Sequence, residues 1–374
     1  MRSLLVVFLA GFSLTVSAAV PKPPSVVGKA WVVGDLTGGQ LLASQKADER
    51  FEPASLTKLM TAYVVFSALR EKKLSLEQQV NVSPRAWKVS GGRMFIEPRK
   101  PVTVDELIRG MVVQSGNDAC IALAEAVAGS EEAFVQLMNR EAARLGLKNT
   151  RFMNSTGLPD AQHYSTAQDL YLLTAALIRD FPNEYAQYYS QKEFRYNNVS
   201  QPNRNRLLWV DPSVDGVKTG HTEAAGYCLI ASSRRGGRRL LSVLLGSTSE
   251  AARAQESLKL LNWGYQFYDS VKLYGAATPV KQIEVWKGAA RHVNVGVGSD
   301  LFVTVPKGEA DKLKAELVSQ QPLEAPLTKG QRVGVLRVTH DGKPYGEYPL
   351  IALEPVAQAG LFGRTWDTLR LWLK

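Results

Sequence analysis

Three short motifs in the chain contain side chains suited to nucleophilic catalysis. The first is Ser55-Leu56-Thr57-Lys58, at the start of an apolar stretch. On a helix, residues three positions apart lie on one face. A serine hydroxyl is a poor nucleophile until a neighbour removes its proton, and a lysine in apolar surroundings has a lowered pKa that lets its neutral amine act as that base. The spacing therefore predicts Ser55 as the nucleophile and Lys58 as its general base.

The second motif, Ser115-Gly116-Asn117, falls at the junction of two predicted helices. From such a junction a serine and an asparagine could reach into a site built around Ser55. Ser-Gly-Asn is also common turn chemistry, so the motif could simply separate two helices. The residues alone leave both interpretations open.

The third motif, Lys218-Thr219-Gly220, lies on a predicted strand that leads into His221. A glycine there lets a ligand approach the backbone, while the lysine and threonine offer a cation and a hydroxyl to a carboxylate. At average usage an S-x-x-K occurs about once by chance in a chain of this length, and a K-T-G only about once in ten such chains. The three motifs in this order therefore form a strong signal.

The elements that must position these motifs follow from periodicity and turn residues. The sequence Thr37-Gly38-Gly39 between two apolar runs predicts a β-hairpin over residues 30–43. We expect helices over residues 56–69, 118–128, 131–145 and 252–268, further helices opening at Thr103 and Thr166, and strands over 226–233 and 240–246. Strands thus lie at both ends of this region, with helices between them.

Composition and the N-terminus limit the setting. The chain has 374 residues, 45% of them hydrophobic and 21% charged, with a formal net charge of +10, which suits a folded protein of about two domains. Arg2, an apolar run over residues 4–12 and the small residues at 16–19 predict a secretory signal peptide. Export argues against nucleic acid as the partner of the basic charge. We interpret Cys120 and Cys228, in apolar surroundings, as buried thiols, with a disulfide as the alternative.

The last hundred residues differ from the rest of the chain in their sequence pattern. Short β-rich runs begin after residue 274, and Asp341-Gly342 predicts a hairpin turn between two of them. In the final segment most apolar side chains fall within one helical arc of about 140°, with Leu371 as the exception. They are Leu361, Phe362, Trp366, Leu369, Trp372 and Leu373. This pattern favours a helix lying in a membrane interface, and a terminal helix docked on the protein's own core is the alternative.

S-x-x-K, S-x-N and K-T-G in this order mark the penicillin-binding proteins and serine β-lactamases. Together with the residues around them, they resemble the low-molecular-mass D-alanyl-D-alanine carboxypeptidases of the penicillin-binding protein 5 type, over nearly the whole chain. The resemblance implies an α/β (α+β) DD-peptidase/β-lactamase-like domain with an antiparallel sheet flanked by helices, a small all-β domain and a terminal amphipathic helix. We expect a signal peptide over 1–19, a catalytic domain over 20–272, a β-rich domain over 273–355 and an anchoring helix over 356–374.

The resemblance also implies roles for individual residues. Ser55 would be acylated, Lys58 would accept its proton, and Ser115 would relay a proton to the leaving D-alanine. Substrate-binding roles would fall to Asn117, Lys218, Thr219, Gly220, His221 through its main chain, Arg204 and, with a looser match, Arg253. Residues 154–169 resemble the family's loop below the site, which influences deacylation. No cofactor or metal is implied.

The expected reaction is removal of the terminal D-alanine from peptidoglycan stem pentapeptides, with β-lactam antibiotics as covalent inhibitors. The expected location is the periplasmic face of the bacterial inner membrane, held by the C-terminal helix. The rivals are a DD-endopeptidase, a β-lactamase and a non-catalytic cell-wall scaffold. No Glu-x-x-Leu-Asn motif follows Ser115, which argues against the β-lactamase.

Overall fold

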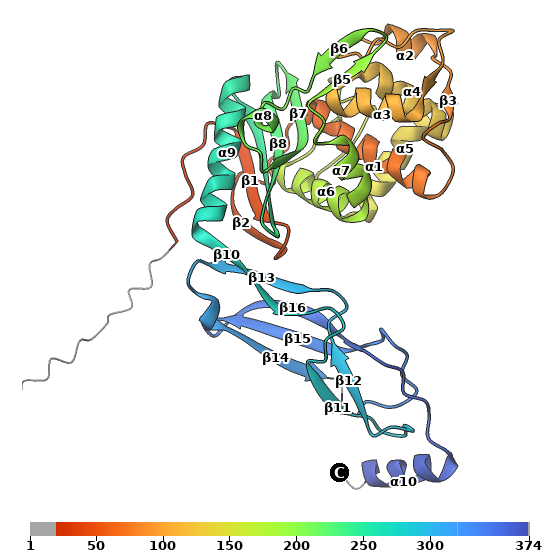
Figure 1. Cartoon of the computed structure of the whole chain (residues 1–374), viewed down its shortest axis with the longest axis vertical. Coiled ribbons are helices and arrows are strands. Elements are labelled where there is room, and N and C mark those ends of the chain that lie inside the picture. The colour runs from red at the N-terminus through yellow and green to blue at the C-terminus, as the bar shows by residue number, and fades with distance from the viewer. Residues whose placement is uncertain (1–19, 320, 373–374) are drawn as a thin grey trace, which may run out of the picture.

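The computed structural model describes residues 20–319 and 321–372. Figure 1 shows a larger part with helices on both sides of a sheet, a smaller part made of strands, and a short helix at the far end of the smaller part. The predicted signal peptide over residues 1–19 lies outside the described residues.

The sheet of the larger part is antiparallel and has five strands in the order β2-β1-β9-β8-β7. Their bounds are β1 (Ala30–Asp35), β2 (Gln40–Gln45), β7 (Val214–Thr222), β8 (Gly226–Arg235) and β9 (Arg238–Ser247). Helix α9 (Glu250–Phe267) packs on one face of this sheet, and α6 (Ala167–Asp180) packs on the other. The first and last thirds of this region thus form the sheet, as the alternation of predicted strands and helices indicated.

Helix α1 (Lys58–Arg70) runs through the centre of the helical half and is buried along almost its whole length. A 3₁₀ turn, η1 (Ala54–Thr57), precedes it, so the helix predicted from residue 56 starts with a tighter turn that contains Ser55. Around α1 lie α3 (Val104–Val113), α4 (Asn117–Ala128) and α5 (Glu131–Arg144). The capping box predicted at Thr103 is present: Thr103 and Glu106 each accept from the other's backbone N–H.

Several short elements had no clear signal in the sequence. They are β3 (Gln79–Val80), α2 (Pro84–Lys88), β4 (Val102–Thr103), α7 (Pro182–Tyr188), β5 (Glu193–Tyr196), β6 (Val199–Pro202) and α8 (Leu207–Val210). Each spans too few residues for a helical or strand period to be recognised.

The smaller part is built from strands around its own apolar core. Five strands form a sheet in the order β11-β12-β16-β15-β14, and β10 pairs with β13. Their bounds are β10 (Tyr268–Tyr274), β11 (Lys281–Glu284), β12 (His292–Gly296), β13 (Leu301–Pro306), β14 (Leu313–Ser319), β15 (Arg332–His340) and β16 (Lys343–Ala352), with a 3₁₀ turn, η2 (Ala310–Lys312). Asp341 and Gly342 form the predicted turn between β15 and β16. The predicted fold class is therefore confirmed.

Helix α10 (Leu361–Trp372) lies across the end of the smaller part (Figure 1). Its polar face contacts the β domain: Asp367 Oδ2 accepts from the backbone N–H of Lys287 at 2.7 Å, and Arg370 lies over the Trp286 ring. Leu371, the exception to the apolar arc, is only partly exposed and faces a cavity beside this domain. Among the helices of the described residues, none has the length and apolar character needed to span a bilayer.

Candidate active site

A cleft of about 430 Å³ lies between the helical half and β7. Eight of the ten predicted site residues line it: Ser55, Ser115, Asn117, Arg204, Thr219, Gly220, His221 and Arg253. The other two, Lys58 and Lys218, are buried behind its walls and hydrogen-bond to residues that line it. The three motifs therefore meet at one place, although they lie far apart in the sequence.

Ser55 and Lys58 are in direct contact. The distance between Lys58 Nζ and Ser55 Oγ is 3.1 Å, and the amine donates to Asn117 Oδ1 at 2.7 Å and to the backbone carbonyl of Thr156 at 2.6 Å. A carbonyl oxygen can only accept. In the neutral form the amine has two N–H groups, and these two carbonyls can engage both of them. In that form the lone pair faces the Ser55 hydroxyl, which is the arrangement a general base requires.

The surroundings of Lys58 favour this neutral form. Its side chain is 1% exposed, and burial lowers its pKa; the nearby Arg204 cation acts in the same direction, while Cys120 and Asp118 act against it.

Cys120 and Cys228 are free, buried thiols, as predicted, and burial raises the pKa of Cys120 to about 12. Cys120 therefore stays protonated beside the amine at neutral pH.

Asn117, the first residue of α4, is held from both sides. Its Nδ2 donates to the carbonyl of Ser90 at 2.7 Å, which turns Oδ1 toward Lys58. The next residue, Asp118, accepts from the backbone N–H groups of residues 94, 95 and 96. These bonds fix the segment before α3 against the start of α4, where Gly91 and Gly92 form part of the cleft wall.

Ser115 lies between α3 and α4 with a left-handed backbone, φ 61°. This conformation is uncommon for a residue with a Cβ and tends to persist where a functional constraint holds it. It directs Oγ to Lys218, whose Nζ donates to it at 2.9 Å and to the Thr219 carbonyl at 3.0 Å. Burial lowers the pKa of Lys218 well below its usual value, and the charge of nearby Arg204 lowers it further.

Strand β7 is the edge strand of the sheet and forms the opposite wall of the cleft. An edge strand leaves backbone N–H and C=O groups available to an extended peptide. At Gly220 an added Cβ would lie 3.2 Å from both Leu56 Cγ and the Pro53 carbonyl, so the missing side chain allows β7 to approach η1 closely. Ser55 and His221 thereby line the same cleft.

The two predicted arginines differ in setting. Arg253 on α9 is 3% exposed, donates to the Gly220 carbonyl at 3.4 Å and pairs with Glu250 at 3.2 Å. Burial lowers its pKa. Arg204 is exposed at the mouth of the cleft. Arg253 thus lies beside Gly220 of β7, whereas Arg204 Nη2 would lie 3.6 Å from a Cβ added at Gly92.

The sequence did not assign the backbone carbonyl of Thr156 or the residues that hold it. The resemblance placed a loop over 154–169 below the site but gave no role to its main chain. The glycine at position 157 was the one signal in the sequence for a tight loop here. In the structure Gly157 has a left-handed φ of 85°, and an added Cβ would lie 1.8 Å from the Ala54 carbonyl. Within the described residues, no group of three His, Cys, Asp or Glu side chains could hold a metal ion.

Comparison with known proteins agrees with this geometry. Residues 17–249 match the family described as D-alanyl-D-alanine carboxypeptidase, and residues 268–358 match the penicillin-binding protein 5 C-terminal domain. The chain is 46% identical over 371 residues to the D-alanyl-D-alanine carboxypeptidase DacC of Escherichia coli strain K12, covering 96% of this chain and 92% of that protein.

Solved structures resemble the chain in the same way. Penicillin-binding protein 5 from Haemophilus influenzae has a TM-score of 0.84 and 39% identity, covering 90% of this chain and 100% of that one. Penicillin-binding protein D2 from Listeria monocytogenes in its ampicillin-bound form has a TM-score of 0.60 and 30% identity, covering 66% and 100%. The chain therefore belongs to the D-alanyl-D-alanine carboxypeptidase family, in the branch that has a penicillin-binding protein 5 C-terminal domain.

Proposed function

We propose that this chain is a serine D-alanyl-D-alanine carboxypeptidase that removes the terminal D-alanine from peptidoglycan stem pentapeptides through an acyl-enzyme at Ser55. The observation that carries the proposal is the 3.1 Å contact of Lys58 Nζ with Ser55 Oγ, together with the two carbonyl acceptors of the same amine. When the amine is neutral, these acceptors take its two N–H groups and its lone pair faces the hydroxyl. Family membership supports the same activity.

In the first half of the reaction, Ser55 Oγ attacks the carbonyl carbon of the D-Ala-D-Ala peptide bond while its proton passes to Lys58 Nζ. The oxyanion accepts from the backbone N–H groups of Ser55 and His221. The C–N bond then breaks, and the leaving amine takes up the proton held by Lys58, relayed through Ser115, so Lys58 returns to its neutral form. The terminal carboxylate lies against Thr219, with Lys218 behind it.

In the second half, a water molecule attacks the ester carbonyl and gives its proton to Lys58. The ester C–O bond breaks, Ser55 regains its proton, and the shortened peptide leaves as a carboxylate. A β-lactam follows the first half only, because the amine released when its strained ring opens stays tethered to the acyl group. The ampicillin-bound form of the Listeria protein supports β-lactams as ligands here.

The test is incubation with a fluorescent penicillin followed by peptide mapping, together with release of D-alanine from a pentapeptide. We expect label on Ser55 and stoichiometric D-alanine. Label on another residue would overturn the mechanism. Cleavage of crosslinked dimers without D-alanine release from the pentapeptide would instead favour the endopeptidase, and no label at all would favour the non-catalytic scaffold.

We also propose that the chain is exported and held on the periplasmic face of the inner membrane by α10, with the β domain as a spacer. In α10 the large apolar side chains are exposed, among them Phe362 at 93% and Trp372 at 89%. The N-terminal sequence supports export. Sedimentation of the mature chain with lipid vesicles tests the anchor.

A further inference from the structure

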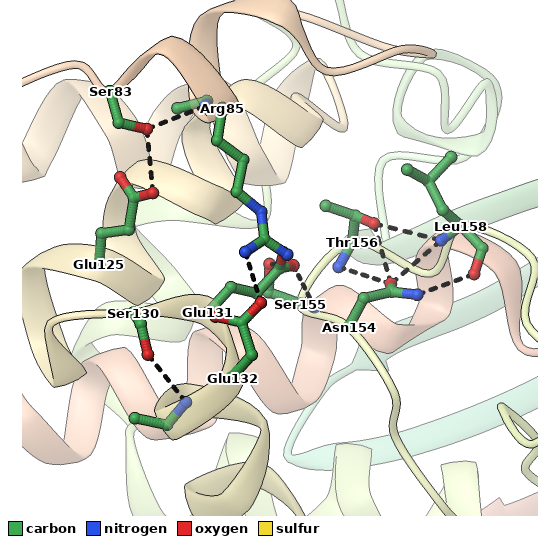
Figure 2. A network of polar contacts seen from close by, with 12 residues as sticks. Ser83, Arg85, Glu125, Ser130, Glu131, Glu132, Asn154, Ser155, Thr156 and Leu158 are labelled. Atoms are coloured by element: carbon green, nitrogen blue, oxygen red, sulfur yellow. Dashed lines mark hydrogen bonds and ion pairs between the residues drawn. The ribbon is translucent and has the colours of Figure 1, made fainter.

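The carbonyl of Thr156 is one of the two groups that orient the Lys58 amine, so whatever fixes that carbonyl affects the general base. It lies on a tight loop, residues 154–158, that runs under the cleft. Asn154 Oδ1 accepts from the backbone N–H groups of Thr156, Gly157 and Leu158, which closes the loop on itself (Figure 2). These internal bonds set the shape of the loop but do not attach it to the rest of the domain.

The attachment comes from Glu131, the first residue of α5. Its Oε1 accepts from Ser155 Oγ at 2.6 Å and from Ser155 N at 2.9 Å. From the other side, Thr61 on α1 donates to the Ser155 carbonyl at 2.6 Å. The peptide unit next to Thr156 is thus held between α5 and α1, one residue away from the carbonyl that contacts Lys58.

Glu131 is itself an unusual group, because its side chain is only 5% exposed. A buried carboxylate is costly unless a cation pairs with it. Arg85 on α2 supplies that cation: Nη2 lies 2.6 Å from Glu131 Oε2, and Nη1 lies 2.5 Å from the exposed Glu132 (Figure 2). Ser83, which caps α2, donates in turn to Glu125 on α4.

The segment around α2 therefore supports both acceptors of Lys58. On one side, the Ser90 carbonyl orients Asn117, as described above. On the other side, Arg85 holds Glu131, which holds Ser155 and so the Thr156 carbonyl. Of the residues in these two sets of contacts, only Asn117 and Thr156 hydrogen-bond to Lys58 in the part of the chain that the structure describes.

We propose that Glu131 is a positioning residue for acylation: its carboxylate, paired with Arg85, fixes the 154–158 loop so that the Thr156 carbonyl keeps the Lys58 lone pair directed at Ser55. This inference rests on the proposed function, in which Lys58 is the general base. It assigns a step-specific role to an ion pair that otherwise resembles a structural contact between α2 and α5.

The test measures the maximal rate constant and the half-saturating concentration for acylation by a fluorescent penicillin. In Glu131→Ala both bonds to Ser155 are lost, and we expect a maximal rate constant about 100-fold lower, the scale found for small misplacements of catalytic groups. The half-saturating concentration should change little, because Thr156 contacts the base through its carbonyl. Glu131→Gln keeps the acceptor for Ser155 but replaces the oxygen that pairs with Arg85 by an NH2 group, so it should recover part of the rate.

Glu132→Gln is the matched control, since Glu132 pairs with the same Arg85 from the same helix but is exposed and does not contact the loop. We expect wild-type rates. Ser155→Ala removes only the hydroxyl hydrogen bond to Glu131 and should lower the maximal acylation rate constant several-fold. This variant tests the inference if Glu131→Ala does not fold.

Wild-type rates in Glu131→Ala or, where that variant does not fold, in Ser155→Ala would overturn the inference. A Glu131→Gln variant as slow as Glu131→Ala, together with a Ser155→Ala variant at the wild-type rate, would do the same, because the charge and not the loop contact would then be what counts. Failure of the wild type to label at Ser55 would instead refute the proposed function, so the two failures are distinguishable.

Discussion

The two ends of the molecule depart from the usual distribution of residues in opposite ways. The catalytic part buries charged and polar groups around its cleft, including Lys58, Lys218, Asp118 and Arg253. Among described residues 268–372, only Thr304 is a buried polar side chain, and this end instead exposes the apolar side chains of α10. Buried charge and exposed apolar surface both cost stability. Each departure therefore marks a place where function, and not folding, selects the residues: chemistry at one end and the proposed membrane attachment at the other.

Lys58→Met should have the largest effect, because it removes the buried amine at the catalytic end. General bases contribute about 10²- to 10⁴-fold to rates, so we expect a loss of that size in the acylation rate constant. The apolar side chain fits the buried position in α1, and circular dichroism should show a folded protein. A variant that still labels at a tenth of the wild-type rate would mean that Lys58 is not the base.

Arg238→Ala tests the buried charge of the catalytic part through stability. Arg238 Nε lies 2.6 Å from Asp35, whose side chain is fully buried. Because breaking a buried pair leaves an uncompensated charge, we expect the free energy of unfolding to fall by about 3–5 kcal/mol, measured by urea denaturation.

The comparable ion pair in the β domain joins Arg337 Nε and Glu347 Oε1 at 2.8 Å, and both side chains are more than half exposed. Exposed pairs are worth about 0–1 kcal/mol, so Arg337→Ala should shift the urea midpoint only slightly. Equal losses in the two variants would contradict the contrast between the two ends.

Trp366→Ser tests the exposed apolar surface. Trp366 is 60% exposed on α10, and burying a large apolar side chain is worth about 1.5–3 kcal/mol when complete. We expect binding to vesicles to weaken about tenfold, as measured by sedimentation. Val199→Ser is the control, because Val199 is also exposed but lies on β6 of the catalytic part. If both variants bind vesicles equally, α10 is not the attachment surface.

The sequence predicted the parts of this contrast that depend on local spacing. Ser55 and Lys58 are three residues apart, so a helical turn alone brings them together, although the turn is 3₁₀ at Ser55. The convergence with Ser115 and Lys218 came from the resemblance, since these residues lie 60 and 163 positions beyond Ser55 and no local rule brings such distant residues together. The amphipathic pattern of α10 could likewise be predicted, and Leu371, the exception, lines a cavity together with residues of the β domain.

The supporting contacts could not be predicted. Arg85 and Glu131 are 46 positions apart and look like ordinary surface charges in the sequence. Only the packing of α2 against α4 and α5 shows that one of them is buried. The acceptor on Lys58 is a backbone carbonyl, which every residue has, so residue type carries no information about it. Sequence thus identifies reacting side chains better than the residues that orient them.

A pH-dependent effect on stability is predicted for a buried histidine below the catalytic site. His163 contacts Thr57 Oγ1 at 2.9 Å, and burial lowers its pKa to about 4, from an ordinary value of 6.5. Between these values the unfolded chain binds a proton that the folded chain does not, so stability is lost as pH falls from about 6.5 toward 4. Its share between pH 7 and pH 5.5 is about 1 kcal/mol.

His163→Gln should remove that share, so its urea midpoint should fall less than that of the wild type between pH 7 and pH 5.5. His292→Gln is the matched control, because His292 is exposed on β12 of the other end. It should keep the wild-type pH dependence. If the two variants respond alike, the histidine below the cleft does not remain neutral by burial, and the contrast between a catalytic end that buries ionisable groups and an end that leaves them in water would fail at this position.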